Sequence, residues 1–427
     1  MDLSLLFTIL NLVCGGLFVA CYAHQIFYVF YTLFKKHKTY PETDKTNRYA
    51  VLICGRNEEN VIGYLIDSLK NQDYPTDKVD IYVCADNCTD HTADVARERG
   101  ATVLERFNTQ LVGKGYALSE LIQMIYDAHG MDAYAGYFVV DADNLLDPHF
   151  ISEMDKCFCS GENYGVIAGY RNSKNFDENW LSSGYSVWFL HEGKQLNNAR
   201  SLLGVSGAVS GTGFMIHKDV LKNQGGWIHH LLIEDVEFSA DNLTKGVKIG
   251  YCHDAILYDE QPVNFIQSWH QRMRWVKGYL QVLRRYGGRI VKGIFKKGGF
   301  SCYDLLTNIG AAYLLVPAAV LINIVYLVLT LIFTPQKFLM ALITALISVG
   351  MGYLAMFFLS FFACITEKKR IKASTGKRIK AMFVFPFFMF SFVPIAIVAF
   401  FTPKVKWRPI EHRVTVTVDD VSTNQDE

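Results

Sequence analysis

The chain has 427 residues, of which 51% are hydrophobic, and its formal net charge is +1. This length allows one sizeable soluble domain plus a membrane part, and the hydrophobic content is high for a purely soluble enzyme. A charge so close to zero selects no oppositely charged partner, and we expect no nucleic acid to be bound. The ten cysteines are scattered, which favours free thiols in a reducing cytoplasm over a disulfide framework.

Four segments are apolar enough to meet a bilayer: residues 3–34, 305–333, 338–365 and about 381–401. The first has no basic start and no small-residue cleavage site, so we interpret it as an anchor. Basic residues follow it at 35–38 and recur in 368–380, and the positive-inside rule puts both stretches in the cytoplasm. We therefore expect a multi-pass protein of the plasma (inner) membrane with a cytoplasmic catalytic domain.

The fourth apolar segment conflicts with that rule. A plain crossing would put Lys404, Lys406, Arg408 and Arg413 outside. The segment contains two prolines, so a broken, re-entrant or interfacial hairpin is the alternative, and we predict that loop 368–380 and the tail near Trp407 are both cytoplasmic. The loop is either a gate over the nucleotide or a solvated connection.

Between these segments, short apolar strands alternate with helices. Strands are expected at residues 50–54, 79–84, 102–104 and 137–140, with helices at 60–69, 90–99 and 117–126. Repeated strand–helix units predict a parallel sheet covered on both faces. Ligands bind beyond the carboxyl ends of such strands, where four polar sets occur: Arg56-Asn57-Glu58, Asp86-Asn87, Lys114 and Asp141-Ala142-Asp143.

Asp141 and Asp143 follow a fully apolar strand and can both face that crevice. Carboxylates together with ligand phosphates suit Mg²⁺ or Mn²⁺, which would neutralise a diphosphate leaving group. The alternative is a loop cap, a position that Asp and Asn favour. Asp86 could accept from a nucleobase or ribose, or cap a helix. Lys114 lies between glycines and could reach phosphate or base edges, or be solvated.

Glu234-Asp235 is a candidate for acid–base work. Transfer of a sugar to a hydroxyl with inversion needs one base to remove the acceptor proton, and we assign this role to Asp235, with Glu234 beside the acceptor. The alternative is that these acids only favour a helix N-terminus. The turn at Gly211-Thr212 is expected to be close-packed near the acceptor.

Gln271, Arg274 and Trp275 lie in a helix-like stretch, residues 265–283, at a spacing that puts them on one face. Arg suits diphosphate oxygens, and Trp suits stacking on a sugar ring. The alternative is a basic amphipathic helix at the membrane interface, and one helix can serve both purposes.

Taken in order, these motifs resemble the membrane-integrated family 2 glycosyltransferases, the relatives of cellulose, hyaluronan and poly-N-acetylglucosamine synthases. The resemblance covers about residues 48–290 and rests on Gly55-Arg56-Asn57-Glu58, Ala85-Asp86-Asn87, Gly113-Lys114-Gly115, Asp141-Ala142-Asp143, Gly211-Thr212-Gly213, Glu234-Asp235 and Gln271-Arg272-Met273-Arg274-Trp275. Ile233 stands where the family often has Thr, and Cys54-Gly55 replaces its usual Pro.

The resemblance implies a GT-A (Rossmann-like) α/β fold, an inverting mechanism, and a UDP-sugar donor with Mg²⁺ or Mn²⁺. By matching motif, Asp86 would contact uracil, Asp141 and Asp143 the nucleotide and metal, and Asp235 would be the base. Gln271, Arg274 and Trp275 would hold the diphosphate and the acceptor.

The expected organisation is a GT-A domain inserted between membrane elements. Its parts are an N-terminal transmembrane helix (1–34), the GT-A glycosyltransferase domain (35–262), amphipathic interfacial helices (263–303), a C-terminal transmembrane region (304–403) and a polar tail (404–427). The one N-terminal span leaves a polymer channel within one chain in doubt, so a homo-oligomer or accessory export subunits are possible partners.

Three functions compete. The first is a processive polysaccharide synthase with coupled export, favoured by Gln271-Arg274-Trp275. The second transfers one sugar to a membrane lipid, as a glycolipid or polyprenyl-phosphate sugar synthase would, and the small membrane part favours it. The third is a transporter or receptor with a nucleotide-sensing domain, against which the base-plus-metal set argues.

Overall fold

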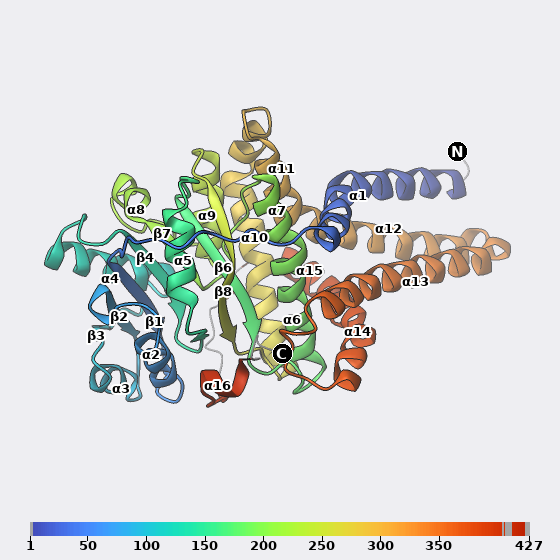
Figure 1. Ribbon diagram of the computed structural model, residues 1–427. Helices are drawn as coiled ribbons and strands as arrows, with labels where there is room; N and C mark the ends of the chain where they lie inside the picture. The colour runs from blue at the N-terminus through green and yellow to red at the C-terminus, as the bar shows by residue number, and fades with distance from the viewer. Residues whose placement is uncertain (1–2, 404, 406–411, 423–427) are drawn as a thin grey trace.

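The computed structural model describes residues 3–403, 405 and 412–422. In it, a single eight-stranded sheet has the order β3-β2-β1-β4-β7-β6-β8-β5 (Figure 1). Its strands are β1 (Tyr49–Gly55), β2 (Val79–Asp86), β3 (Thr102–Arg106), β4 (Gly136–Asp141), β5 (Leu145–Leu146), β6 (Val166–Ser173), β7 (Phe214–His217) and β8 (Ile249–Asp259).

The sheet is mixed. Strands β3, β2, β1 and β4 run parallel, as the strand–helix repeat predicts. Strand β7 is antiparallel to both β4 and β6, and β5 is antiparallel to β8. The parallel arrangement is therefore confirmed for the four strands expected from the sequence, and the additional strands β5 and β7 make the complete sheet mixed. Apolar patterning identifies a strand but carries no direction, and β7 is entered through a turn in which Gly211 and Gly213 have φ values of 78° and 63°.

Helices cover both faces of the sheet because side chains alternate between the faces along each strand. Ala50 and Leu52 of β1 pack with Leu121 of α4 in one apolar cluster. Val51 and Ile53 pack with residues of α2 in the other. The sheet thus forms the middle layer of the catalytic body.

The helices continue in chain order to the C-terminal region. They are α1 (Leu3–Phe34), α2 (Ile62–Lys70), α3 (Thr92–Glu98), α4 (Lys114–His129), α5 (Phe150–Cys159), α6 (Trp180–His191), α7 (Asn198–Leu203), α8 (Lys218–Gln224), α9 (Glu234–Thr244), α10 (Phe265–Ile294), α11 (Phe300–Leu306), α12 (Ala312–Phe333), α13 (Pro335–Thr366), α14 (Thr375–Phe390), α15 (Phe392–Phe401) and α16 (Val418–Val421). Three short elements are a 3₁₀ turn, η1 (Thr76–Lys78), and two π-helical turns, η2 (Glu192–Asn197) and η3 (Thr307–Ala311).

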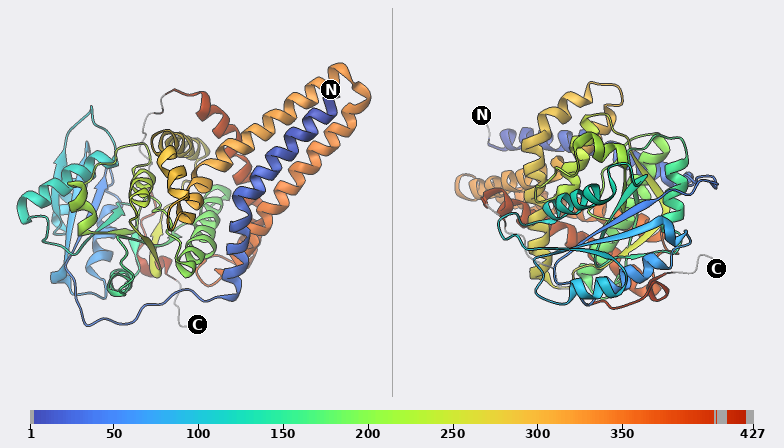
Figure 2. Two further views of the ribbon diagram at one scale, coloured as in Figure 1. Left: turned by 90° about the horizontal axis from the view of Figure 1, so that it is seen from above. Right: turned by 90° about the vertical axis from the view of Figure 1, so that its left-hand side faces the viewer.

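Four helical segments are long and apolar enough to cross a membrane: Ser4–Phe34, Phe300–Phe333, Pro335–Thr366 and Thr375–Phe401. They match the four apolar segments read from the sequence. Helices α1, α12 and α13 extend together away from the catalytic body (Figure 2). In the fourth segment, α14 and α15, 33% of the apolar window is buried inside the protein, compared with 11% or less in the others. This segment therefore packs on protein far more than the other three do.

Helices α14 and α15 meet at Ser391; α15 packs along α10, whereas α14 packs on α13 and α6. Asn264 starts α10 by accepting hydrogen bonds from two backbone amides of its first turn. Further along, the fully buried Arg272 contacts the Ser391 hydroxyl and lies over the rings of Phe388 and Phe392. Arg272 thereby fastens the bend between α14 and α15 to the catalytic body.

Both flanks of the α14–α15 segment return to the catalytic body. Lys377, in the first turn of α14, donates to Asp177 at 2.9 Å, and Lys277 of α10 donates to the Ala399 carbonyl at 3.3 Å. Lys372, in the loop before α14, contacts the carbonyl oxygen of Asp420 in the tail. Loop 368–374 and tail 412–422 thus lie on the same side of the molecule as the sheet. Lys404, Lys406, Trp407 and Arg408 are outside the described residues.

Candidate active site

The carboxyl ends of six strands lie at one edge of the sheet. Strands β1 to β4 are parallel, strand β6 points the same way as β4 because β7 is antiparallel to both, and β8 is parallel to β6. The edge therefore gathers the residues that end or follow β1, β2, β3, β4, β6 and β8. The candidate site is built at this edge, where the strand-end rule predicts it.

A cluster of carboxylates occupies the centre of this edge, and we call it the acidic cluster. It consists of Glu58, Asp141, Asp143, Asp259 and Glu260. Asn144 holds part of it together, because its amide nitrogen donates to Asp259 at 3.0 Å and to Asp143 at 3.4 Å. Asp259 also accepts from Arg171 Nε at 2.8 Å.

The tail places a histidine in the acidic cluster. His412 Nδ1 lies 3.3 Å from Asp143 Oδ2 and 3.8 Å from Glu260 Oε2, and His412 Nε2 lies 3.9 Å from Glu58 Oε1. The next two residues fix this position, since the backbone amides of Arg413 and Val414 donate to Glu260 at 2.9 and 3.1 Å. The imidazole is thus held among three acids.

Mutual repulsion and burial shift the proton affinities in the acidic cluster. Burial raises the pKa of Glu58 to about 8, and the charges of Asp143, Asp141 and Glu260 add to the shift. Burial, with the charges of Asp259 and Asp141, also raises the pKa of Asp143 well above its usual range. Negative charge at this edge is therefore incompletely compensated by the side chains around it.

Asp86 ends β2 with both of its oxygens engaged by arginines. Arg56 donates to one carboxylate oxygen at 2.9 Å and Arg106 to the other at 2.7 Å. Arg106 is almost fully buried and also donates to Glu120 at 2.7 Å. Asp86 therefore orients Arg56 at the rim of the site, and its predicted contact with a nucleobase stays a prediction.

Lys114 and the turn at residues 211–213 connect the acidic cluster to the second half of the site. Lys114 Nζ contacts Asp141 and donates to the Gly211 carbonyl at 2.8 Å. Burial alone would lower the pKa of Lys114, but the charges of Asp141 and Glu234 raise it above its usual value. The lysine is therefore cationic. Thr212 joins the same network by accepting the Asp141 amide at 2.8 Å.

Asp235 lies at the N-terminus of α9 and receives the Gly211 amide at 2.6 Å. Burial raises its pKa, while Lys114 and Arg274 oppose the shift. Burial and the Asp235 charge also raise the pKa of Glu234, to about 7. Glu234 and Asp235 are therefore both buried and lie close to two cations, Lys114 and Arg274. The Gly211 amide fixes the Asp235 carboxylate.

Helix α10 contributes the predicted amide, guanidinium and ring. Arg274 donates to the Leu232 carbonyl at 2.9 Å, just before the acidic pair. Among the described residues, Gln271 Oε1 is buried without a hydrogen-bond partner. Trp275 packs edge-on to Tyr185 with ring centroids 5.7 Å apart. The structure thus brings Arg274 to the acidic pair.

Most of the residues proposed from sequence are connected in the structure. The contacts above join Asp141, Lys114, Gly211, Thr212 and Asp235, and further interactions link Glu58, Asp143, Glu234 and Arg274 to this group. The contacts above do not connect Arg56, Asp86, Gln271 and Trp275 to it. The sequence did not predict the other charged residues of the site: Arg106, Arg171, Lys174, Glu192, Asp259, Glu260 and His412. The charge of Lys174 lies near Asp143 and Glu260 in the acidic cluster. Burial raises the pKa of Glu192, whose charge lies near Arg200, Arg171 and Asp235. For Asp259 and Glu260 a signal existed, since they end an apolar strand just as Asp141 does.

The sequence profile described as "Glycosyltransferase like family 2" matches residues 47–278, more than half of the chain. The chain belongs to glycosyltransferase family 2. This agrees with the motif resemblance and with the position of the site at the carboxyl edge of the sheet. The catalytic body has a GT-A-like fold, and four helical segments of the chain are long and apolar enough to cross a membrane.

Curated relatives of this glycosyltransferase have two kinds of named product. The chain is 26% identical over 289 residues to the beta-monoglucosyldiacylglycerol synthase of Nostoc sp., covering 64% of this chain and 57% of that one. It is 24% identical over 246 residues to the poly-beta-1,6-N-acetyl-D-glucosamine synthase of Staphylococcus epidermidis, covering 57% of each. The chain thus spans somewhat more than half the length of these relatives.

A solved structure supports the fold. The mannosyltransferase PcManGT from Pyrobaculum calidifontis, in complex with GDP-Man and Mn²⁺, aligns with a TM-score of 0.56 at 16% identity, covering 91% of this chain and 98% of that one. At this identity the likeness concerns the fold alone. It extends over almost the whole chain.

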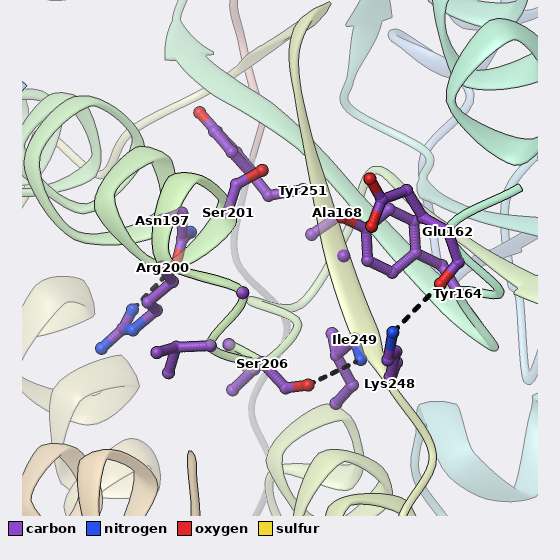
Figure 3. A pocket seen from close by; sticks show the side chains of 15 residues that line it. Glu162, Tyr164, Ala168, Asn197, Arg200, Ser201, Ser206, Lys248, Ile249 and Tyr251 are labelled. Atoms are coloured by element: carbon purple, nitrogen blue, oxygen red, sulfur yellow. Dashed lines mark hydrogen bonds between the residues drawn. The ribbon is translucent and has the colours of Figure 1, made fainter. Parts of the chain in front are cut away.

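The glycosyltransferase also has a small cavity away from the acidic cluster, shown in Figure 3. It lies at the start of β8, the opposite end of that strand from Asp259, between Asn197, Arg200 and Tyr251, and its volume is about 40 Å³. The Ile249 amide donates to Ser206 there at 3.2 Å. Small-molecule sites occupy roughly 300–1,000 Å³, so this cavity is too small for a nucleotide sugar.

Proposed function

We propose that this enzyme is an inverting, metal-dependent glycosyltransferase that uses a UDP-sugar to elongate a polysaccharide at the cytoplasmic face of a plasma (inner) membrane. The observation that carries the proposal is the connection of the acidic cluster, through Lys114 and Gly211, to the enclosed Asp235. A diphosphate binding centre and a general base are then parts of one hydrogen-bonded unit, as transfer from a nucleotide sugar requires.

The acidic cluster fits a divalent cation by its donor chemistry. Among the described residues, no three acidic, His or Cys side chains form a preformed metal site. Mg²⁺ and Mn²⁺ need few protein ligands when phosphates supply others, at about 2.0–2.1 Å for Mg²⁺. Ligands at right angles are then about 3 Å apart, close to the 3.3 Å between His412 Nδ1 and Asp143 Oδ2. We propose Asp143 as a ligand, with Glu260 and His412 beside it and Asp141 towards the nucleotide. A bound ion would neutralise charge on the diphosphate.

The proton transfer follows from Asp235. In the proposed reaction, the acceptor hydroxyl oxygen attacks C1 of the sugar, Asp235 takes the hydroxyl proton, and the C1–O bond breaks as UDP departs with the bonding electrons. The Gly211 amide donates to one Asp235 oxygen and thereby orients the carboxylate that would take the proton. Lys114 and Arg274 are the nearby cations that would hold the leaving diphosphate.

The proposed donor contacts extend to the rim of the site. Arg56 and Asp86 would meet the nucleoside, and Gln271 and Arg274 the diphosphate. Trp275, Glu234 and the turn at Gly211 and Thr212 would meet the acceptor. The unpartnered Gln271 oxygen supports a ligand at this end of α10, because a buried polar atom without a partner is costly.

The acceptor is the part of the proposal with a rival. Transfer of a single sugar to a membrane lipid is favoured by the relative that is named a monoglucosyldiacylglycerol synthase and by the small membrane part. Chain elongation is favoured by the relative that is named a poly-N-acetylglucosamine synthase and by Gln271, Arg274 and Trp275. Coupled export would then involve a homo-oligomer or accessory subunits.

One experiment tests both parts. The purified full chain is given single UDP-sugars with Mn²⁺ and a membrane lipid extract, and the products are separated by size and by solubility in organic solvent. We expect UDP release with one donor and a product larger than a disaccharide. A lipid-soluble product carrying one sugar supports the rival, and no UDP release with any UDP-sugar contradicts the donor assignment.

A further inference from the structure

A second polar cavity lies where two candidate membrane helices end. Helix α1 ends at Phe34 and α13 at Thr366, and the Phe30 and Phe362 rings lie 6.2 Å apart just before these ends. The cavity has a volume of about 330 Å³, within the range of roughly 300–1,000 Å³ typical of small-molecule sites. We call it the basic pocket; it is lined by Thr32, Leu33, Phe34, Lys35, Lys36, His37, Lys194 and Thr366.

The cations of the basic pocket outnumber the acids near it. Glu367 accepts from the Tyr170 hydroxyl at 2.7 Å and is 3.7 Å from Arg370 and 3.9 Å from Lys194. Asp254 is shared in the same way by His37 at 3.1 Å and Arg370 at 3.6 Å.

Lys35 and Lys36 are exposed, and neither has an acidic partner among the described residues. Positive charge is therefore left over at the mouth of the basic pocket.

A buried histidine behind the pocket responds to this charge. The His253 ring stacks on His37 with centroids 4.2 Å apart. Burial lowers the pKa of His253 well below its usual range, and Arg370, His37 and Lys194 lower it further. The surroundings of the pocket thus favour an anion.

The location decides which anion is suitable. Its lining residues come from the ends of two candidate membrane helices and from η2, and none belongs to the carboxyl edge of the sheet. Basic pockets between membrane helices at the membrane surface bind anionic lipid headgroups.

We propose that the basic pocket binds the phosphate headgroup of an anionic glycerophospholipid, with Lys35, Lys36 and Lys194 as its cationic contacts. A free phosphate has the same charge chemistry, so the test must separate the two sources. The lipid assignment rests on the helix ends, because both helices are candidate membrane spans and a span ends at the membrane surface, where phospholipid headgroups lie.

The test measures lipid binding without using activity. The full chain is reconstituted in phosphatidylcholine nanodiscs with graded phosphatidylglycerol, and the retained phosphatidylglycerol is counted by native mass spectrometry after mild release. The triple variant Lys35→Gln, Lys36→Gln, Lys194→Gln should retain at least about tenfold less, since each lysine near an anionic surface contributes substantially. The control is Lys296→Gln with Lys297→Gln, an exposed pair just before the candidate span Phe300–Phe333.

Each outcome of this experiment supports or overturns the assignment of the basic pocket as a lipid site. We expect the control to change retention by less than about twofold; equal losses in both variants would mean diffuse surface attraction and overturn the pocket. If inorganic phosphate displaces the lipid, and binds in detergent with the same dependence on the three lysines, the lipid assignment is overturned. Should the triple variant unfold, Lys194→Gln alone is compared with Lys296→Gln, and unchanged retention in Lys194→Gln rejects the proposal.

Discussion

Asp143 is 6% exposed and has Asp259, Glu260 and His412 as neighbours. Asp143→Asn should lower turnover at least about 100-fold in saturating Mn²⁺, because charge-stabilising groups at a reacting centre contribute at this level. Steady-state UDP release measures the effect, and Asp67→Asn on the exposed side of α2 is the control. Retention of more than about a tenth of the activity would remove Asp143 from the metal role.

Asp235 and Glu234 can be separated by kinetics. Asp235→Asn should reduce the rate at saturating substrate by about 100-fold or more while leaving UDP affinity nearly unchanged, as loss of a general base should. Glu234→Gln should have the smaller effect on that rate. UDP affinity is measured by calorimetry and the rate by single-turnover experiments. A variant Asp235→Asn that loses UDP binding but keeps its rate would transfer the base role to Glu234.

Glu58 and Glu234 predict a pH dependence of stability. Burial raises their pKa values to about 8 and about 7, from an ordinary 4.5. The folded chain therefore holds protons that the unfolded chain releases, so the free energy of unfolding falls as pH rises from about 4.5 to about 8. In metal-free buffer, the melting temperature should fall by a few degrees over this range.

Glu58→Gln is the variant that tests this origin. Its side chain stays neutral, so the fall with pH should become shallower, while the exposed Glu98→Gln should behave like the parent. Thermal unfolding followed by tryptophan fluorescence in detergent checks both. A slope unchanged by Glu58→Gln would show that other groups cause the pH dependence.

At the residue scale, the sequence predicts a candidate site residue where that residue ends or follows a recognisable strand. Asp141 and Asp143 are predicted by that rule, and in the structure Lys114, Asp235 and Arg274 lie close to them. Arg106 could not be predicted, because it holds Asp86 and a buried partner leaves no pattern in the sequence. The contact of Asp86 with a nucleobase stays a prediction, and both of its oxygens accept from arginines in the structure.

At the scale of elements, the sequence pattern could not predict the directions of the strands or the position of the tail. Strands β6 and β8 bring Arg171 and Asp259 to the site because they run in the same direction as β4, with the antiparallel β7 lying between β4 and β6 in the sheet. The tail returns to β8 from the far end of the membrane region. No local periodicity relates His412 to Asp143, so the contact is a property of the three-dimensional fold.

The position of His412 in the tail leads to a prediction about metal binding. His412→Ala should weaken Mn²⁺ binding in the presence of UDP by roughly tenfold, the lower end of the effect expected for groups that support a metal site. Mn²⁺ affinity is measured by electron paramagnetic resonance, with the exposed His149→Ala as control. Hydrogen exchange at Arg413 and Val414 should slow when Mn²⁺ and UDP are added. Tighter Mn²⁺ binding in His412→Ala would mean that the histidine competes with the metal.

At the scale of the whole molecule, the membrane helices and the catalytic body meet through polar contacts. Asp304 of α11 accepts from Arg200 of α7 at 2.7 Å and lies 3.2 Å from His24 of α1. The Tyr28 hydroxyl donates to the same carboxylate at 3.2 Å. Removing one partner of a buried ion pair is strongly destabilising, because the other charge is left buried without compensation. The contacts of Asp304 therefore hold α1 and α11 in place on the catalytic body.

The orientation of the α14–α15 segment relative to the membrane can be predicted from its contacts. Because Lys372 contacts the carbonyl oxygen of Asp420, and Lys377 and Ala399 both contact the catalytic body, loop 368–380 and the tail should be accessible from the same side as the sheet. By the positive-inside rule that side is the cytoplasm.

Single cysteines are introduced in a functional variant lacking reactive native thiols, at Lys372, Ser422 and Gln336. An impermeant maleimide added to inside-out vesicles should label Lys372→Cys and Ser422→Cys, while Gln336→Cys, at the start of α13 and remote from the catalytic body, should react only in right-side-out vesicles. Labelling of Ser422→Cys together with Gln336→Cys would mean that α14 and α15 cross the membrane as one span.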